Sequence, residues 1–390
     1  ARRVWVQRHG NNLDGIRSEL AIATIPKVLL DHLHFVHTHG APARIPLDDT
    51  RVTTKPYTSY LDFEEEGMAT QWEELIHGRI VMCSSASEPW LKGLKSSPFA
   101  RVPKVGPDRR PTGKGRHVHD QQRINALGSK WDHPPALQPT YPSVSRQIMQ
   151  LVASYPGLDV VMSKNDIRSA FRLIWLMLQD ISVFSTEVPG ASYGILGSII
   201  KIFLVLSFGF SGSPGEYQVW AVASKIMHSA FRPYRAHFNG WHAFSSFFPV
   251  DDQVLVDILI GNRPWENARC SVFCNRTVFG RDSINEEKSA EEAAWSKEKM
   301  IWGINYSTTT MAASLPEAKL QKAAFILADK ELDPGFECLK LHTLQVLRGN
   351  LQHWAYVIPA VKPELGVVNR LLGLGVELSL IHISEPTRPY

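Results

Sequence analysis

Cysteine is scarce in this sequence and the cysteines are scattered. The 390 residues contain four of them, at positions 83, 270, 274 and 338. Cys270 and Cys274 are close in sequence, but no second pair completes a zinc site, and the count is too low for a disulfide scaffold. We therefore expect reduced thiols in an intracellular protein that is not secreted.

Long apolar runs and strong net charge are also missing. The most apolar stretch, residues 195–210, is interrupted by Lys201 and is too short to span a bilayer, so it predicts buried core and no membrane. The formal net charge of +4 and the pI of about 8.8 are mildly basic, which fits a polyanionic partner without establishing one. With 390 residues, two or three subdomains are expected.

The two ends of the chain call for separate treatment. The sequence begins at Ala1 and not at Met, which suggests a piece of a longer polyprotein. Residues 378–388 read LSLIHISEPTR, which resembles the translation of an adapter used in sequencing libraries. We interpret residues 378–390 as a non-native tail and leave them out of the fold reasoning.

Two segments of the N-terminal third have unusual compositions. Residues 31–39, DHLHFVHTH, contain four histidines but no set of further ligands, so surface histidines are favoured over a metal site. Residues 92–116 carry eight basic residues against the single acidic Asp108, with prolines that prevent a continuous helix. This segment is either a flexible basic hairpin that binds phosphate or a solvated linker.

Three aspartates lie in apolar surroundings. LDVVMSKNDI predicts a strand that ends near Asp166, and FFPVDDQVLVDILIG predicts a hairpin with Asp251 and Asp252 at its tip. Adjacent carboxylates repel each other, and Mg²⁺ would relieve that conflict. Taken alone, the pair is also typical of a simple turn.

Helices are predicted in the C-terminal third. A charged helix over residues 286–299 would start with a capping box, Ser283-x-x-Glu286, and would contain an ion pair between Lys288 and Glu292. Beyond Pro316, two amphipathic helices are predicted in EAKLQKAAFILADKEL and LHTLQVLRGNLQHWAYVI.

Several short motifs follow one another in an informative order. Two motifs come first, SSPFARVPKV and GRHVHDQQRIN. Three motifs follow them, in the order SKNDIRSAFRLI, LSFGFSGSPGEYQ and PVDDQVLV. The last two are INEEKSAEEAAWSKEKM and LPEAKLQKA. Over residues 76–372 this order resembles the reverse transcriptase domain of retrotransposon polyproteins, with its fingers segment, motifs A, B and C, and an N-x-x-K segment. The resemblance implies an α+β right-hand polymerase with an antiparallel palm sheet flanked by helices. Its parts would be an unassigned extension (1–75), fingers (76–157), palm (158–310) and thumb-like helices (311–377).

The resemblance also implies site roles. Asp166, Asp251 and Asp252 would hold two Mg²⁺ ions, with Mn²⁺ as a substitute, and Lys288 would protonate the leaving pyrophosphate or serve as a surface lysine. The ring of Phe171 would exclude a 2′-hydroxyl, or would be an ordinary core aromatic. Residues at the nucleotide would be Arg116, either Arg109 or Arg110, and the motif B residues Gly209, Ser213 and Pro214.

The implied reaction adds deoxynucleoside triphosphates to a primer on an RNA or DNA template. Some residues depart from the family pattern: Pro249 and Val250 precede the aspartate pair, and Phe208 stands where many members have Gln. The alternatives are therefore an inactive nucleic-acid-binding derivative, a different two-metal enzyme such as a nuclease, and a decayed retroelement fragment.

Overall fold

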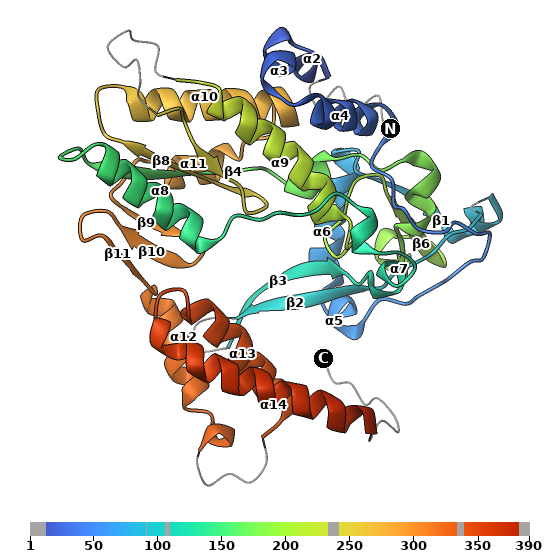
Figure 1. Ribbon diagram of the computed structural model, residues 1–390. Helices are drawn as coiled ribbons and strands as arrows, with labels where there is room; N and C mark the ends of the chain where they lie inside the picture. The colour runs from blue at the N-terminus through green and yellow to red at the C-terminus, as the bar shows by residue number, and fades with distance from the viewer. Residues whose placement is uncertain (1–12, 91, 106–109, 233–241, 334–338, 382–390) are drawn as a thin grey trace. The chain divides into compact units, whose positions relative to one another are not determined.

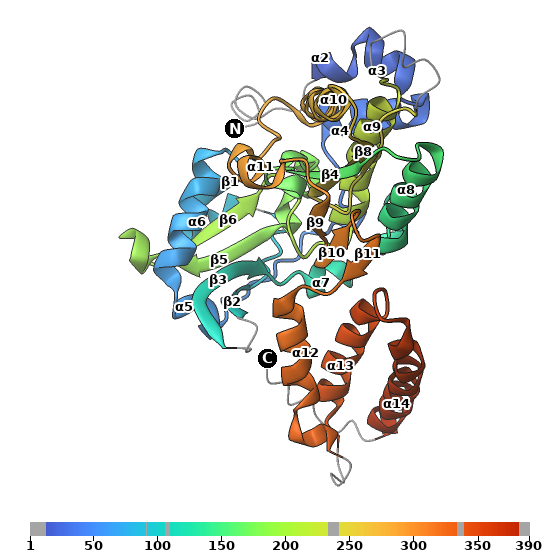
Figure 2. The same ribbon diagram turned by 90° about the vertical axis from the view of Figure 1, so that its left-hand side faces the viewer.

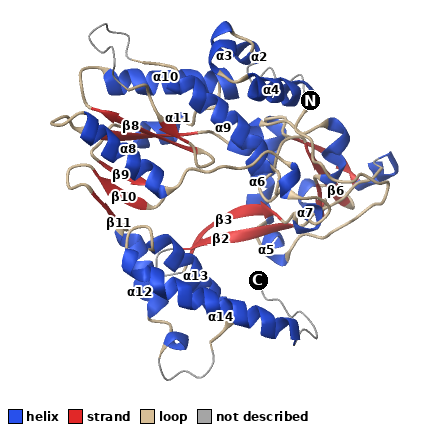
Figure 3. Cartoon of the chain, in the orientation of Figure 1, coloured by secondary structure: helices blue, strands red, loops and turns tan. Residues whose placement is uncertain are grey.

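The computed structural model describes residues 13–90, 92–105, 110–232, 242–333 and 339–381. Contacts divide the chain into two compact units. The first unit consists of residues 1–104, 113–140 and 146–296, and the second of residues 105–112, 141–145 and 297–390. Helices and strands are mixed along the chain (Figure 3). The predicted mixture of helices and strands is thus confirmed, and the bounds of fingers, palm and thumb stay predictions.

The first unit contains an antiparallel sheet that carries the aspartates. Its strand order is β4-β8-β7, with β4 at Val160–Asp166, β8 at Asp252–Ile258 and β7 at Ser246–Phe247. Every residue of β4 is buried, both the apolar Val160, Val161 and Met162 that favour a strand and the polar residues from Ser163 to Asp166. The predicted strand therefore ends at Asp166, and the predicted hairpin connects β7 to β8.

Helices pack against this sheet (Figure 1). The helix α10 (Arg263–Phe279) packs on β8 and on α9 (Ser213–Ser229), and α11 (Glu286–Glu292) packs on β4. The large buried rings of Trp220, Tyr217 and Phe279 fill the interface between α9 and α10.

A second antiparallel sheet of this unit has the order β1-β6-β5 (Figure 2). Its strands are β1 (Ile80–Ser84), β6 (Ser198–Phe203) and β5 (Ser185–Pro189), and α6 (Glu64–Ile76) lies beside β1. Residues 199–203 of the central strand are buried, which confirms that the apolar stretch forms core, although Leu196 before it is exposed. The polar exception is Lys201, which is fully buried and donates a hydrogen bond to the Tyr193 hydroxyl.

The basic segment forms a two-stranded hairpin of β2 (Phe99–Val105) and β3 (Pro111–His119). The short helix α7 (Gln122–Asn125) follows β3. The helix α8 (Tyr141–Ser154) begins in the residues of the second unit and continues in those of the first.

The N-terminal helices belong to the first unit. They are α2 (Leu13–Ile16), α3 (Glu19–Thr24), α4 (Lys27–His39) and α5 (Thr58–Leu61). The histidine-rich segment lies in α4, which buries Leu30, Leu33 and Val36 at helical spacing and packs against α9.

The second unit combines a small sheet with three helices. The sheet has the order β11-β10-β9, with β9 at Glu298–Ile301, β10 at Ile304–Ser307 and β11 at Ala312–Ser314. The helices are α12 (Glu317–Leu327), α13 (Leu341–Trp354) and α14 (Lys362–Ile381). The two amphipathic helices predicted after Pro316 are confirmed. The suspected tail is helical as far as Ile381, and its remainder lies outside the described residues.

The structure bears on two predictions, the reduced thiols and the absence of a membrane-spanning segment. Cys83, Cys270 and Cys274 are free thiols, while Cys338 lies outside the described residues. In the described part of the chain, none of the helices has the length and apolar character needed to cross a membrane.

Candidate functional site

The three predicted metal ligands meet where β4 ends and β8 begins. Asp166 is the residue directly opposite Asp252 in the antiparallel ladder. One residue further on, the amide of Ile167 donates a 2.8 Å hydrogen bond to the carbonyl oxygen of Asp251. Side chains of directly opposite residues lie on the same face of a sheet, so the register places the carboxylates of Asp166 and Asp252 side by side.

The turn before the aspartate pair has a strained backbone. Val250 has a φ of 70°, which is unfavourable for a β-branched residue. Pro249 lies in the turn between β7 and β8, so its missing N–H costs the ladder no hydrogen bond. Strain of this kind persists where surrounding structure enforces it, and it is common at functional sites.

The carboxylate of Asp166 is held by two donors from the start of α11. The Lys288 ammonium lies 2.7 Å from Oδ1 of Asp166, and the Asn285 side-chain amide donates a 2.9 Å hydrogen bond to Oδ2. Asn285 also caps the helix, since its side-chain oxygen accepts from the amide of Lys288. The bond to Asp166 raises the pKa of Lys288.

The helix predicted over residues 286–299 ends at Glu292, and Glu298 and Lys299 belong to β9. The contacts of α11 correct two further sequence predictions. The N-cap of α11 is Asn285 and not Ser283, whose carbonyl accepts a hydrogen bond from the Arg168 amide instead. Lys288 is paired with Asp166, and Glu292 is paired with Lys164. Lys288 and Glu292 therefore both form ion pairs with residues of β4. The ion pair predicted between the two of them on the surface of the helix is not formed.

A buried tyrosine lies within the electrostatic influence of all three carboxylates. Tyr217 on α9 is fully buried, and its hydroxyl has no hydrogen-bond partner among the described residues. Burial raises its pKa well above the usual value, and the negative charges of Asp251, Asp166 and Asp252 add to the rise. Burial, together with the charges of Asp251 and Asp166, also raises the pKa of Asp252.

These residues suit a divalent cation in kind. The carboxylates of Asp166, Asp251 and Asp252 offer the oxygen ligands that hard cations such as Mg²⁺ prefer. Within the described ranges, however, no three His, Cys, Asp or Glu side chains are gathered closely enough to hold a metal ion. The carboxylate of Asp166 is instead engaged by Lys288 and Asn285.

The residue predicted as the aromatic gate belongs to an aromatic cluster beside the aspartates. Phe171 follows two residues in the left-handed region, Ser169 and Ala170, so the chain turns sharply after β4. Its ring is 7% exposed and lies 5.0 Å from the ring of Phe208 and 5.6 Å from that of Tyr217. Phe208 is 46% exposed. The sequence analysis noted Phe208 only because it differs from the family pattern. In the structure Phe208 is more exposed to solvent than Phe171.

The motif B residues form a tight turn into α9. Gly209 has a φ of 100°, and a Cβ there would lie 2.5 Å from the carbonyl oxygen of His119. Ser213 is buried and its hydroxyl donates to the carbonyl of Ser207, while Pro214 stands in the first turn of the helix. The side chain of Asn125 fixes the turn by donating to the Gly209 carbonyl and accepting from the amide of Ser211.

The basic hairpin exposes fewer cations than its composition implies. Lys95 is buried in an ion pair with Asp48, and Arg101 is buried in an ion pair with Glu66. Arg116 and Arg110 are exposed, whereas Arg109 lies outside the described residues. The predicted phosphate-binding arginine is thus accessible, while Lys95 and Arg101 stabilise the fold.

A buried carboxylate behind the motif B turn escaped sequence reasoning. Glu216 on α9 is fully buried and lies 3.0 Å from a ring nitrogen of His32 and 3.0 Å from one of His133, with Arg44 nearby. Burial would raise the pKa of Glu216, but the hydrogen bonds from His133 and His32 outweigh it and lower the pKa.

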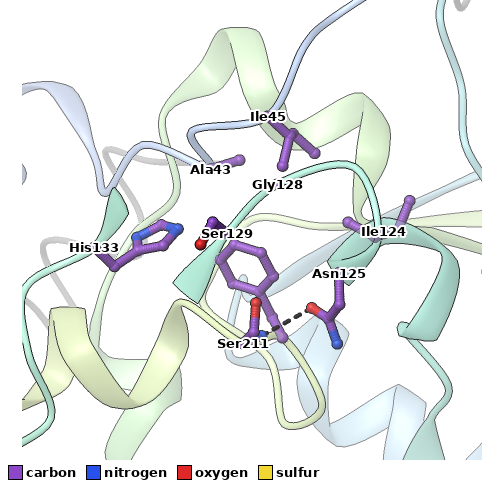
Figure 4. Close-up of a pocket in the computed structure, with 9 residues that line it drawn as sticks. Ala43, Ile45, Ile124, Asn125, Gly128, Ser129, His133 and Ser211 are labelled. Atoms are coloured by element: carbon purple, nitrogen blue, oxygen red, sulfur yellow. Dashed lines mark hydrogen bonds between the residues drawn. The ribbon is translucent and has the colours of Figure 1, made fainter. Parts of the chain in front are cut away.

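A small pocket lies next to His133 (Figure 4). It is lined by residues of the N-terminal segment, of the segment around α7 and of motif B: Ala43, Ile45, Ile124, Asn125, Gly128, Ser129, His133, Phe210 and Ser211. The Asn125–Ser211 hydrogen bond joins two of these lining residues (Figure 4). None of the three aspartates lines this pocket, so it is separate from the candidate metal site.

Comparison with known proteins identifies the fold. No protein-family model matches the chain, and no curated protein matches it. Among solved structures, the chain is similar to the foamy viral protease-reverse transcriptase dRH in complex with ds DNA, with a TM-score of 0.52 and 14% identity over 93% of this chain and 55% of that one. It also matches the foamy viral protease-reverse transcriptase in complex with RNA/DNA hybrid, with a TM-score of 0.49 and 14% identity over 94% of this chain and 42% of that one.

The first of these matches shows a reverse-transcriptase-like fold. The chain spans about half the length of that solved chain. At this identity the likeness extends to the fold alone.

Proposed function

We propose that this chain is the polymerase core of an RNA-directed DNA polymerase from a retrotransposon polyprotein. The observation that carries the proposal is the β4–β8 register, which sets Asp166 opposite Asp252 with Asp251 in the adjoining turn. The order of sequence motifs and the reverse-transcriptase-like fold support it.

In this proposal Asp166, Asp251 and Asp252 hold two Mg²⁺ ions, for which Mn²⁺ can substitute. When bound, such ions activate the attacking hydroxyl and neutralise charge on the phosphates. The three carboxylates fix where the primer end and the triphosphate meet. Lys288, next to Asp166, supplies a proton donor within reach of the same place.

The remaining residues orient the substrates. The exposed guanidinium of Arg116 offers two parallel N–H donors to phosphate oxygens. Gly209 and Asn125 fix the turn that leads into α9, and the Phe171 ring would border the sugar of the incoming nucleotide. The partners are a primed RNA or DNA template and deoxynucleoside triphosphates, with the duplex bound mainly through its phosphates.

A primer-extension assay on a homopolymer template, with Mg²⁺ or Mn²⁺, tests the proposal. We expect extension by the unaltered chain and loss of extension in Asp251→Asn. As a matched control, Asp132→Asn removes an exposed carboxylate that is distant in sequence from the three aspartates, and it should leave extension intact. Degradation of the primer would point to a nuclease, and tight duplex binding without extension would overturn the polymerase assignment.

A second candidate is a nucleic-acid-binding derivative that no longer catalyses. It is favoured by one observation, namely that Lys288 and Asn285 occupy both oxygens of Asp166. The same assay separates the candidates, because this derivative would bind a duplex without extending its primer.

A further inference from the structure

The apolar residues of β4 and β8 do not by themselves define how the two strands align. Each strand contains a run of consecutive apolar residues, 160–162 in β4 and 254–256 in β8, and all of them are buried. Because such a run presents a similar surface on both faces, a shift of one strand against the other would still bury these side chains. The strands are also far apart in the sequence, so no short turn between them fixes their register.

A buried pair of amide side chains lies next to the aspartates. Asn165 is directly opposite Gln253 in the ladder, and both side chains are buried. The adjacent pair of the ladder is that of Asp166 and Asp252. Since successive side chains of a strand point to opposite faces, the amide pair and the aspartate pair lie on different faces of the sheet. The register that pairs the amides therefore also pairs the aspartates.

Helices behind the sheet complete a polar network around Gln253. Its Oε1 accepts hydrogen bonds of 2.6 Å from the Ser271 hydroxyl, 2.7 Å from the Asn275 amide and 3.4 Å from the Asn165 amide. The Asn165 amide also donates a 3.4 Å bond to the Ser271 hydroxyl oxygen, and the Ser224 hydroxyl of α9 donates a 2.7 Å bond to Asn275. We call these buried residues the amide network: Asn165, Ser224, Gln253, Ser271 and Asn275.

The amide network is unfavourable for the stability of the core. Its polar groups must be desolvated, and Nε2 of Gln253 has no hydrogen-bond partner within the described ranges. Apolar side chains of similar volume are often as stable or more stable at such buried positions. The network does discriminate between registers, because a shifted strand would carry Asn165 away from Gln253 and leave buried amides unpaired.

We propose that the amide network selects the register of β4 on β8 and thereby sets Asp166 opposite Asp252. Its members are positioning residues, because they act on the aspartates through the alignment of the two strands. The consequence for catalysis rests on the proposed function, whereas the selection of the register does not.

An apolar variant of the network separates register selection from stability. It combines five substitutions: Asn165→Leu, Ser224→Ala, Gln253→Met, Ser271→Ala and Asn275→Leu. All partners are replaced together, so no member of the network stays behind as an unpaired polar group. We expect the free energy of unfolding in urea to equal or exceed that of the unaltered chain.

Disulfide cross-linking measures the register directly. The Ile167 amide donates to the Asp251 carbonyl, which makes these residues a hydrogen-bonded pair of the ladder. Asp166 and Asp252 are the next pair and are therefore not hydrogen-bonded to each other, an arrangement in which side chains approach closely enough for a disulfide. The in-register test pair is Asp166→Cys with Asp252→Cys. The out-of-register test pair is Asp166→Cys with Val254→Cys.

The expected result is a preference that depends on the network. With the amide network intact, the in-register pair should cross-link at least about tenfold faster than the out-of-register pair. In the apolar variant this preference should fall to about threefold or less, because no buried amide penalises the shifted strand. Peptide mapping by mass spectrometry distinguishes these disulfides from any that involve the four native cysteines.

The matched control removes another hydrogen-bonded pair of amides. Gln138 donates a 2.9 Å hydrogen bond to Gln218 of α9, and neither residue belongs to β4 or β8. Gln138→Met combined with Gln218→Met should leave the cross-linking preference within about twofold of its original value.

Three results would overturn the proposal. They are an unchanged cross-linking preference in the apolar variant, an apolar variant that unfolds more readily than the unaltered chain, and an equal loss of preference in the control. Absence of any preference while the network is intact would overturn it as well.

Primer extension by chains that keep all three aspartates separates this inference from the proposed function. If the unaltered chain extends primers but the apolar variant keeps its cross-linking preference, the polymerase stands and register selection fails. If the preference is lost but the unaltered chain does not extend primers, register selection stands and the polymerase fails. Where both hold, the apolar variant should extend primers at least about tenfold more slowly, because its carboxylates are misaligned.

Discussion

Asp166 and Asp252 are directly opposite each other across the β4–β8 ladder, at the end of one strand and the start of the other. Burial raises the pKa of Asp252, and repulsion from the like charges of Asp251 and Asp166 adds to the rise. The fold therefore tolerates this pair at the expense of stability.

The first prediction concerns that conflict. Asp252→Asn should raise the free energy of unfolding at neutral pH, without divalent cations, by about 1 kcal/mol. The raised pKa means that the unfolded state ionises first, so the gain should shrink as pH falls towards the usual aspartate range. Urea denaturation at pH 7 and pH 4 measures it. A destabilised variant at pH 7 would contradict the prediction, and Asp132→Asn serves as the exposed control.

The second prediction concerns the backbone of motif B. Gly209→Ala should cost about 3 kcal/mol, because its φ of 100° is unfavourable and its Cβ would approach the His119 carbonyl to 2.5 Å. Gly194 has a φ of 66° with open space around it. Its replacement by Ala is the matched control and should cost about 1 kcal/mol. Equal costs in urea denaturation would show that the close approach to His119 is unimportant.

The third prediction concerns sugar discrimination. Phe171→Val should raise incorporation of ribonucleotides relative to deoxynucleotides by about tenfold, since a smaller side chain leaves room for a 2′-hydroxyl. Single-nucleotide extension with matched nucleotide pairs measures the ratio. Phe35→Val, on the exposed part of α4, is the control. An unchanged ratio in a folded Phe171→Val protein would leave Phe171 as a core aromatic.

The fourth prediction concerns Lys201, whose pKa burial lowers to about 7. Between that value and the ordinary lysine pKa, the unfolded state binds the proton and the folded state does not. Stability should therefore rise with pH from about 7 to about 10. Lys201→Met should remove this rise, as measured by urea denaturation across the range. If the slope survives in Lys201→Met, a different group is responsible.

The elements that carry the aspartates were predictable because they depend on local pattern. A β-branched apolar run gave β4, and two apolar runs around an acidic pair gave the β7–β8 hairpin. Turn and helix signals likewise gave α12 and α13. The position of Asp166 opposite Asp252 depends on the register of the two strands. The order of the motifs suggested that these aspartates lie together, whereas the composition did not.

Other features depend on contacts between distant segments and could not be predicted. Ser283 satisfies the capping rule by residue type, but its carbonyl accepts from the Arg168 amide, so Asn285 caps α11, which begins at Glu286. The sequence placed Lys95 and Arg101 in a basic segment with few nearby acidic residues. In the structure Lys95 pairs with Asp48 and Arg101 pairs with Glu66, both distant in sequence. The N-x-x-K pattern was the one local signal that marked Asn285, and nothing local indicated its contact with Asp166.

Glu216 joins the N-terminal segment to the rest of the first unit. Its buried carboxylate contacts His32 of α4, Arg44 in the segment after α4, and His133. A fragment that lacked the N-terminal residues would keep this buried charge but lose two of its three partners, which is a severe defect. The smallest fragment around α9 that folds stably should therefore include the N-terminal segment.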